Sequence, residues 1–180
     1  MSHFPRRLQV SNHPEFNLLA FDLGGLLAEV RSDFPMLGRY RIEIWLRAQP
    51  TLACIAPDGK SACIWLHSVL NHPETPRSVI AFIICHELIH LLLPPRNVDG
   101  KRTTHPPEFW QAEGERFPNR AVAWRWILAV LGSCLRIDRQ KECTFVSRKW
   151  KSLLNGSRPT LEMLSSILDA GNTTPEEALL

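Results

Sequence analysis

The stretch CHELIHLLLPP, residues 85 to 95, contains the side chains whose types and spacing could do chemistry. Two histidines, His86 and His90, lie four positions apart, and Glu87 directly follows the first. On an α-helix, residues i and i+4 point to the same side, so both imidazoles could bind one metal ion. Glu87 lies off that face, where it can reach a water on the metal without being a ligand. The pattern predicts a zinc hydrolase site, with a carboxylate that takes the proton from a water acidified by the metal.

The residues around this motif favour the metal. The segment VIAFIICHELIHLLL is apolar on nearly every side, which predicts a buried helix. Burying two imidazoles and a carboxylate there is unfavourable by several kcal/mol, on the order of what unpaired polar groups cost, unless each finds a partner. A metal ion is a natural partner. The alternative is a pair of histidines bonded to the backbone, with a glutamate paired to an arginine.

A catalytic zinc also needs a third protein ligand and an open position for water. His105 follows His90 by fifteen positions, after the polar stretch PPRNVDGKRTTH. That stretch is long enough to fold the chain back over the metal. Three glutamates compete with His105 for the role, since a glutamate on the following helix is another common solution: Glu108, Glu113 and Glu115. We favour His105.

The rest of the chain predicts the elements that position these residues. Apolar residues at helical spacing predict a first helix over 14–30. Alternation in RIEIWLR, 41–47, and the β-rich runs on either side of Asp58-Gly59 predict a small antiparallel sheet of about three strands with a turn at 57–60. Thr75 is a good N-cap, Pro76 fits the first helical position, and Pro94-Pro95 must end the motif helix. Two further helices are expected over 106–117 and 119–132.

The bulk composition is that of an ordinary globular domain, with 44% hydrophobic and 22% charged residues and a formal net charge of +3. The longest apolar runs are too short to span a membrane, and we interpret no segment as a signal peptide. Five cysteines without CxxC spacing predict free thiols in a reducing compartment, so we expect a cytoplasmic protein.

At HELIH followed by THPPEFW, the sequence resembles the SprT-like metallopeptidases, which include the protease domain of Spartan, and the related YgjP-type hydrolases. In that group the third histidine opens a motif H-x-x-x-F, here His105 to Phe109. The resemblance covers roughly residues 15 to 130 and is strongest over 80 to 111. It implies that His86, His90 and His105 bind Zn²⁺ and that Glu87 is the general base and acid. It also implies a peptide substrate laid beside the strand around 61–68 as an added edge strand.

The composition changes after residue 133, so we divide the chain into a metallopeptidase domain, 1–133, and an extension, 134–180. Residues 136–158 contain seven basic and two acidic side chains, with Phe145 and Trp150 among them. Such a stripe is a candidate contact for single-stranded or damaged DNA, although a solvated basic surface is the simpler interpretation. The extension has no CxxC pair, so we expect no second zinc.

Together these features predict a compact α+β, zincin-like (SprT-like) domain with an N-terminal helix, a small antiparallel three-stranded sheet, the HExxH helix and following helices. The expected activity is zinc-dependent hydrolysis of peptide bonds in a peptide or protein substrate, without a membrane partner. Two alternatives remain open: a regulatory or sensor domain that binds zinc without turnover, and a DNA-associated binding module. The sequence does not define a specificity pocket.

Overall fold

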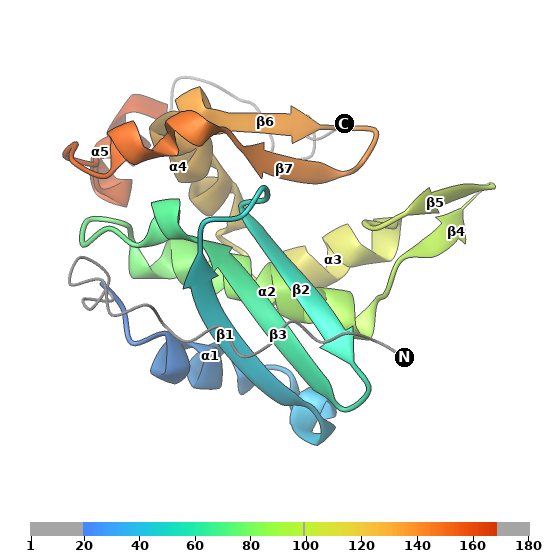
Figure 1. Cartoon of the computed structure of the whole chain (residues 1–180). Coiled ribbons are helices and arrows are strands. Elements are labelled where there is room, and N and C mark those ends of the chain that lie inside the picture. The colour runs from blue at the N-terminus through green and yellow to red at the C-terminus, as the bar shows by residue number, and fades with distance from the viewer. Residues whose placement is uncertain (1–19, 99, 169–180) are drawn as a thin grey trace.

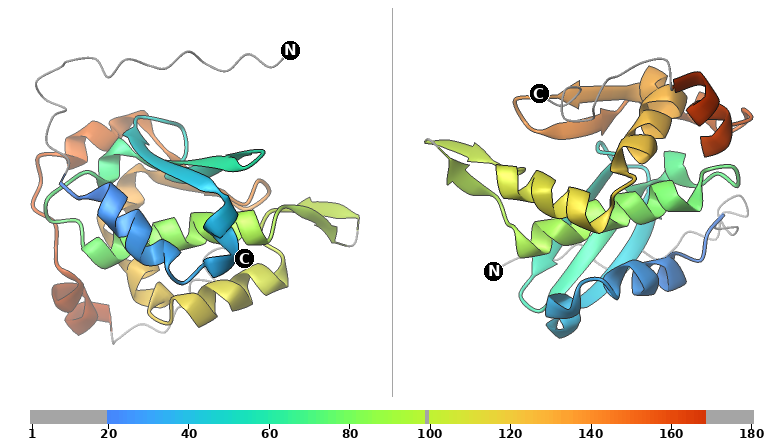
Figure 2. Two further views of the ribbon diagram at one scale, coloured as in Figure 1. Left: turned by 90° about the horizontal axis from the view of Figure 1, so that it is seen from below. Right: turned by 180° about the vertical axis from the view of Figure 1, so that it is seen from behind.

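The computed structural model describes residues 20–98 and 100–168 (Figure 1). The chain combines helices with small sheets, as the mixed patterns predict. Seen from below, the main sheet, the motif helix α2 and helix α3 lie in that order from top to bottom (Figure 2, left). In the part of the chain that the structure describes, every helix is too short or too polar to cross a membrane.

The main sheet contains β1 (Arg41–Arg47), β2 (Ala53–Asp58) and β3 (Ser61–His67), in the order β1-β3-β2. The turn between β2 and β3 was predicted correctly, and Gly59 adopts the positive φ of 58° that such a turn requires. The prediction of a fully antiparallel sheet was wrong, because β1 pairs with β3 in parallel. The chain passes from β1 to the far edge before β3 returns between the two. Alternation within a strand reports its buried face and carries no information about the order of strands.

Helix α2 (Arg77–Leu92) lies at the centre of the molecule and is buried over most of its length. It ends before Pro94-Pro95, as predicted. It begins one residue later than predicted, with Pro76 as the N-cap and no side-chain cap. Thr75 is not the N-cap, because its hydroxyl instead accepts a hydrogen bond of 2.7 Å from the buried Arg158 guanidinium. A contact with a residue far along the chain thus displaces the local capping preference.

Helix α1 (Leu23–Arg31) packs against α2 and β1. It is shorter than the predicted helix: residues 20–22 are not helical, and 14–19 lie outside the described residues. Asp22 caps it by accepting a hydrogen bond of 2.9 Å from the Gly25 N–H. A 3-10 helix, η2 (Pro35–Arg39), then leads into β1.

The polar stretch after α2 contains a hairpin of β4 (Arg96–Val98) and β5 (Lys101–Thr103), two strands that the sequence did not predict. Helix α3 (Pro107–Arg116) and helix α4 (Arg120–Leu131) follow close to the predicted bounds, with Gly132 at the C-cap of α4. Helix α3 packs against α2, which brings the start of α3 near the motif.

A 3-10 helix, η3 (Ser68–Leu70), lies between β3 and α2. After α4 the described chain forms the 3-10 helix η4 (Gly132–Cys134), strands β6 (Leu135–Asp138) and β7 (Cys143–Val146), the 3-10 helix η5 (Arg148–Leu153) and helix α5 (Leu161–Leu168). Strand β7 contacts the segment between β1 and β2: Leu52 N–H donates to the Thr144 carbonyl at 2.9 Å, and Val146 N–H donates to the Pro50 carbonyl at 2.7 Å. The β6–β7 hairpin is therefore fixed to the end of the main sheet.

Candidate metal centre

Two of the candidate ligands come from the C-terminal half of α2. The centroids of the His86 and His90 rings lie 5.0 Å apart, as expected for i and i+4 positions on one helix. The helix is fixed by apolar neighbours on its other sides, since Leu88 and Ile89 between them are fully buried. The helical period therefore places both imidazoles at one site.

His105 joins them from the segment that connects β5 to α3. Its Nε2 lies 3.2 Å from the Nε2 of His86, and one nitrogen of each of the three histidines lies within 4.8 Å of the others. Nitrogens bound to one tetrahedral zinc at about 2.0–2.1 Å lie about 3.3 Å apart. The three imidazoles could therefore hold one metal ion.

The three glutamates that competed with His105 have other partners. Glu108 is exposed and pairs with Arg96 at 2.5 Å, and Glu115 accepts a hydrogen bond of 2.9 Å from Gln111. Glu113 is buried, and its Oε1 lies 2.7 Å from the Nδ1 of His86. None of these three glutamates belongs to the group of side chains that could bind one metal ion, which consists of His86, His90 and His105.

The contact with Glu113 matters for the chemistry of His86. When Nδ1–H donates to the carboxylate, the lone pair of Nε2 is directed toward the shared site, which is the arrangement found behind many metal-bound histidines. Burial disfavours a charged His86, but the Glu113 carboxylate outweighs it and raises the pKa of His86. A more basic imidazole is also a stronger ligand.

Glu142, which was not predicted from the sequence, lies behind His105. Its Oε2 accepts hydrogen bonds from the His105 N–H at 2.8 Å and the Thr104 N–H at 2.7 Å, and its Oε1 accepts one from the Thr103 hydroxyl at 2.6 Å. Burial alone would raise the pKa of Glu142, but these donors outweigh it and lower the pKa to about 2. No local pattern signals this contact, because Glu142 follows His105 by 37 residues.

Aromatic side chains enclose the cluster. Phe109 is fully buried, and its ring centroid lies 4.6–4.9 Å from those of all three histidines. Trp110 stacks on His105 with centroids 5.1 Å apart and planes 26° from parallel. Phe109 and Trp110 thus limit the rotation of the three imidazole rings.

The site favours neutral imidazoles at two positions. Burial, with His86 and His105 acting in the same direction, lowers the pKa of His90 to about 2. Burial and the neighbouring His86 lower the pKa of His105 to about 4. Neutral histidine is the form that binds a metal, so these two ligands need not lose a proton at physiological pH.

Glu87 is the buried carboxyl group that the mechanism requires. Burial raises its pKa to about 7, although His86 acts in the opposite direction. The Glu87 side chain makes no hydrogen bond to another side chain or to the backbone of the described residues. Burial and then the Glu87 charge raise the pKa of Cys54 on β2 and of Cys143 on β7. A carboxyl group with a pKa near the working pH can both accept and return a proton.

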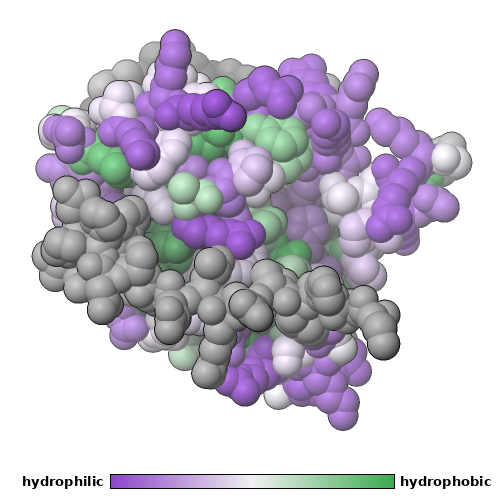
Figure 3. All heavy atoms as spheres, viewed as in Figure 1, coloured by the Kyte–Doolittle hydropathy of each residue, from purple (hydrophilic) through white to green (hydrophobic). Residues whose placement is uncertain are grey.

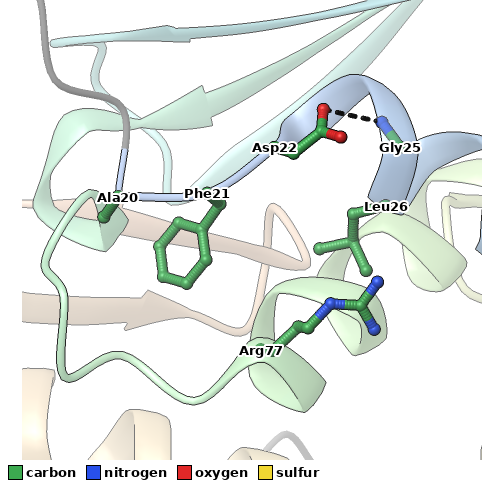
Figure 4. Close-up of a pocket in the computed structure, with 6 residues that line it drawn as sticks. All are labelled: Ala20, Phe21, Asp22, Gly25, Leu26 and Arg77. Carbon is green, nitrogen blue, oxygen red and sulfur yellow. Dashed lines mark hydrogen bonds between the residues drawn. The ribbon is translucent and has the colours of Figure 1, made fainter.

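A pocket of about 340 Å³ lies elsewhere, between the starts of α1 and α2 (Figure 4). Arg77 lines it and lies nine positions before His86, about 13 Å along the helix at 1.5 Å per residue. The Arg77 guanidinium is already paired with Glu29, with Nη1 at 3.0 Å from Oε1. The chemistry of the histidine cluster does not extend into this pocket.

Comparison of the sequence with models of known protein families gives no match, and comparison with curated proteins gives none either. The likeness to the SprT-like group therefore rests on the sequence resemblance described above, which is strongest at HELIH and THPPEFW. One detail taken from it is wrong: β3 is the central strand and pairs with β1 and β2, so a peptide cannot be added along residues 61–67.

Proposed function

We propose that this protein is a zinc-dependent metallopeptidase of the SprT-like kind. The observation that carries the proposal is a buried carboxyl on the same helix turn as two of three converging imidazoles, with its pKa raised to about 7. A purely structural zinc site would have no use for such a carboxyl. Three imidazoles suit zinc and leave one position for water.

The metal, once bound, supplies acidification of water and polarisation of the substrate carbonyl. The protein's own part begins with the ligands: Glu113 orients His86, while Phe109 and Trp110 limit the motion of the rings. Glu87 accepts the proton of the attacking water and then passes it to the amide nitrogen, which leaves as an amine. Burial of Glu87 keeps its charged form poorly solvated, which makes it a better base than an exposed glutamate.

The edge of the main sheet nearest to Glu87 belongs to β2, which pairs with only one strand among the described residues. Helix α2 packs against β2, and Cys54 of that strand lies near the Glu87 carboxyl. An extended peptide paired with β2 would pass beside the proposed base. We therefore propose that an extended substrate pairs with the edge strand β2 and not with the central strand β3.

Contact with DNA remains a second proposal, for the segment 136–158. Hydrophilic side chains gather over β6–β7 at the top of the molecule and over β4–β5 at its right (Figure 3). Trp150, one of the two aromatics in the segment, is buried and packs edge-on against His67 with centroids 4.9 Å apart. Trp150 is thus not exposed for stacking on a base, and Arg136 and Lys141 lie over the ring of Phe145.

The test is cleavage of an unstructured protein by the zinc-loaded enzyme, with and without single-stranded DNA. Glu87→Gln at matched zinc content is expected to lower the rate about 10²–10⁴-fold, the range for loss of a general base. Glu115→Gln is the matched control, because it makes the same change at an exposed position. A Glu87→Gln variant as active as the parent would contradict the mechanism. Zinc binding without turnover in the parent would support the regulatory alternative.

A further inference from the structure

We propose that Glu142, at the end of the β6–β7 turn, is a positioning residue that fixes His105 as the third metal ligand. The inference rests on the metal site of the proposed function, and it does not depend on peptide hydrolysis. It assigns the C-terminal hairpin a part in the metal centre, which is otherwise built from residues 86 to 113.

The Glu142 carboxylate contacts each of the three residues that end at His105. It accepts from the hydroxyl and the N–H of Thr104 at 2.6 and 2.7 Å, from the hydroxyl of Thr103 at 2.6 Å, and from the N–H of His105 at 2.8 Å. The Oε2 of Glu142 also lies 3.3 Å from the Nδ1 of His105, and the Thr104 hydroxyl lies 3.1 Å from the same Nδ1. The backbone and the rear edge of the His105 ring are therefore both fixed, while Nε2 is directed at His86.

The backbone at this position supports a functional reason for the glutamate. Glu142 has a φ of 48°. Among the described residues, it is the one residue other than glycine with a positive φ. The left-handed region costs a residue with a Cβ about 1 kcal/mol, and Gly or Asn would fit it better. Glycine would form the turn more readily but would make none of the four hydrogen bonds. The hydrogen bonds of the side chain therefore explain why a glutamate occupies position 142, whereas the backbone conformation of the turn does not.

The β6–β7 hairpin, which carries Glu142, is held in place by backbone hydrogen bonds. Strand β7 begins at the next residue, and it is joined both to β6 and to the segment 50–52 of the main sheet. The β4–β5 hairpin that precedes His105 has no comparable attachment: its two strands pair with each other and with no other strand of the described chain. Glu142 is thus the link by which a well-anchored hairpin fixes a poorly anchored loop.

The experiment compares zinc affinity and metal-free stability in three variants of the full chain. Glu142→Gly removes the carboxylate and relieves the backbone. Glu142→Gln keeps one acceptor oxygen at the same reach and serves as the rescue. Gln140→Ala, an exposed residue of the same turn, is the control. Zinc affinity is measured by competition with a chromophoric chelator, and the site is also examined by the visible absorption of bound Co²⁺.

We expect Glu142→Gly to bind zinc about 10- to 100-fold more weakly, the range for loss of a residue that orients a ligand. The Co²⁺ spectrum should change, and the metal-free protein should remain cooperatively folded, because relief of the backbone at position 142 offsets part of the stability lost with the four hydrogen bonds. Glu142→Gln should recover most of the affinity, and Gln140→Ala should match the parent.

Parental zinc affinity in Glu142→Gly would overturn the inference. So would a joint fall in affinity and metal-free melting temperature that Glu142→Gln does not reverse, because that pattern indicates a merely structural role. A parent protein that binds no zinc would overturn both the metal centre and this inference. A parent that binds zinc but cleaves nothing would remove only the proposed peptidase activity.

Discussion

His86, Glu87 and His90 lie on one helix that apolar packing holds in place, whereas His105 ends a polar segment that hydrogen bonds hold in place. We call the first group the helix side of the centre, and His105 with Thr103, Thr104 and Glu142 the loop side. On the helix side, the ligands are fixed by a buried core that extends along α2. On the loop side, a single carboxylate receives four hydrogen bonds.

The difference has an energetic consequence. Packing on the helix side is shared with the whole fold, so damage there lowers global stability before it alters the site. The loop side contributes little buried apolar area, so damage there should alter metal affinity while the fold persists. Substitutions on the two sides should therefore have separable effects on stability and on metal affinity.

Replacing Leu88 with alanine should destabilise the packing that holds the helix side in place. Leu88 is fully buried between the two histidines of α2, and its truncation leaves a cavity. We expect a loss of about 2–5 kcal/mol in the free energy of unfolding, measured by denaturant titration of the metal-free protein. Met36→Ala, at a position 73% exposed, should change it by less than about 0.5 kcal/mol. A Leu88→Ala protein as stable as the control would show that packing does not hold this side.

Glu113→Gln should weaken zinc binding without a comparable loss of stability. The variant retains an acceptor for the Nδ1–H of His86 but removes the charge that raises the pKa of that histidine. We expect zinc affinity to fall about 10- to 100-fold, which corresponds to about 1.4–2.7 kcal/mol. Chelator competition measures the change, and Glu115→Gln on the same helix is the control. Equal affinities in the two variants would mean that Glu113 does not tune His86.

His67, where β3 meets the C-terminal segment, should make stability depend on pH. Burial lowers its pKa to about 4, and its Nδ1 accepts a hydrogen bond of 2.9 Å from the Val69 N–H. The unfolded chain, with an ordinary pKa of about 6.5, binds the proton more readily. The stability from neutral His67 is therefore complete above pH 6.5 and is lost as pH falls toward 4.

The expected loss from this group between pH 7 and pH 5 is about 1–2 kcal/mol. His67→Asn keeps an acceptor for the Val69 N–H and does not titrate. Denaturant titrations of the parent and of His67→Asn at both pH values give the contribution as a difference. The same pH dependence in both proteins would exclude His67 as its source.

Thr103→Val should have the smallest effect, because it removes one of four donors to Glu142 and conserves the shape of the side chain. We expect zinc affinity to fall less than about 10-fold, in keeping with a net hydrogen-bond contribution of about 1 kcal/mol. The free energy of unfolding without metal should change by a similar amount or less. A loss as large as that in Glu142→Gly would place the essential contact at Thr103 rather than at the carboxylate.

The same two sides explain what could be predicted from sequence. Positions 86, 87 and 90 share one helix, so their geometry follows from the helical period and needs no knowledge of the rest of the fold. The turn at Asp58-Gly59 was predictable for the same reason, since its signal is local. His105 was found because the stretch after His90 is long enough to fold back over the metal and because His105 to Phe109 matches the motif H-x-x-x-F.

The failures arise from contacts that join distant parts of the chain. Thr75 has the side chain of an N-cap, but Arg158 occupies its hydroxyl. The parallel pairing of β1 and β3 depends on where β2 lies, which no strand pattern encodes. Glu113 was considered only as an alternative to His105 for the third ligand, and its contact with the Nδ1 of His86 was not foreseen. Glu142 gave no signal in the sequence, because its partners lie 37 to 39 residues before it.

The most direct test of the account is the zinc stoichiometry and affinity of the parent, His90→Ala and His105→Ala, one variant from each side. We expect one zinc per parent chain and a loss of affinity of more than about 100-fold in both variants, because each removes a ligand rather than the support of one. We also expect that both metal-free variants remain folded. A parent without zinc, or a His105→Ala protein that binds zinc as tightly as the parent, would contradict a single centre built from both sides.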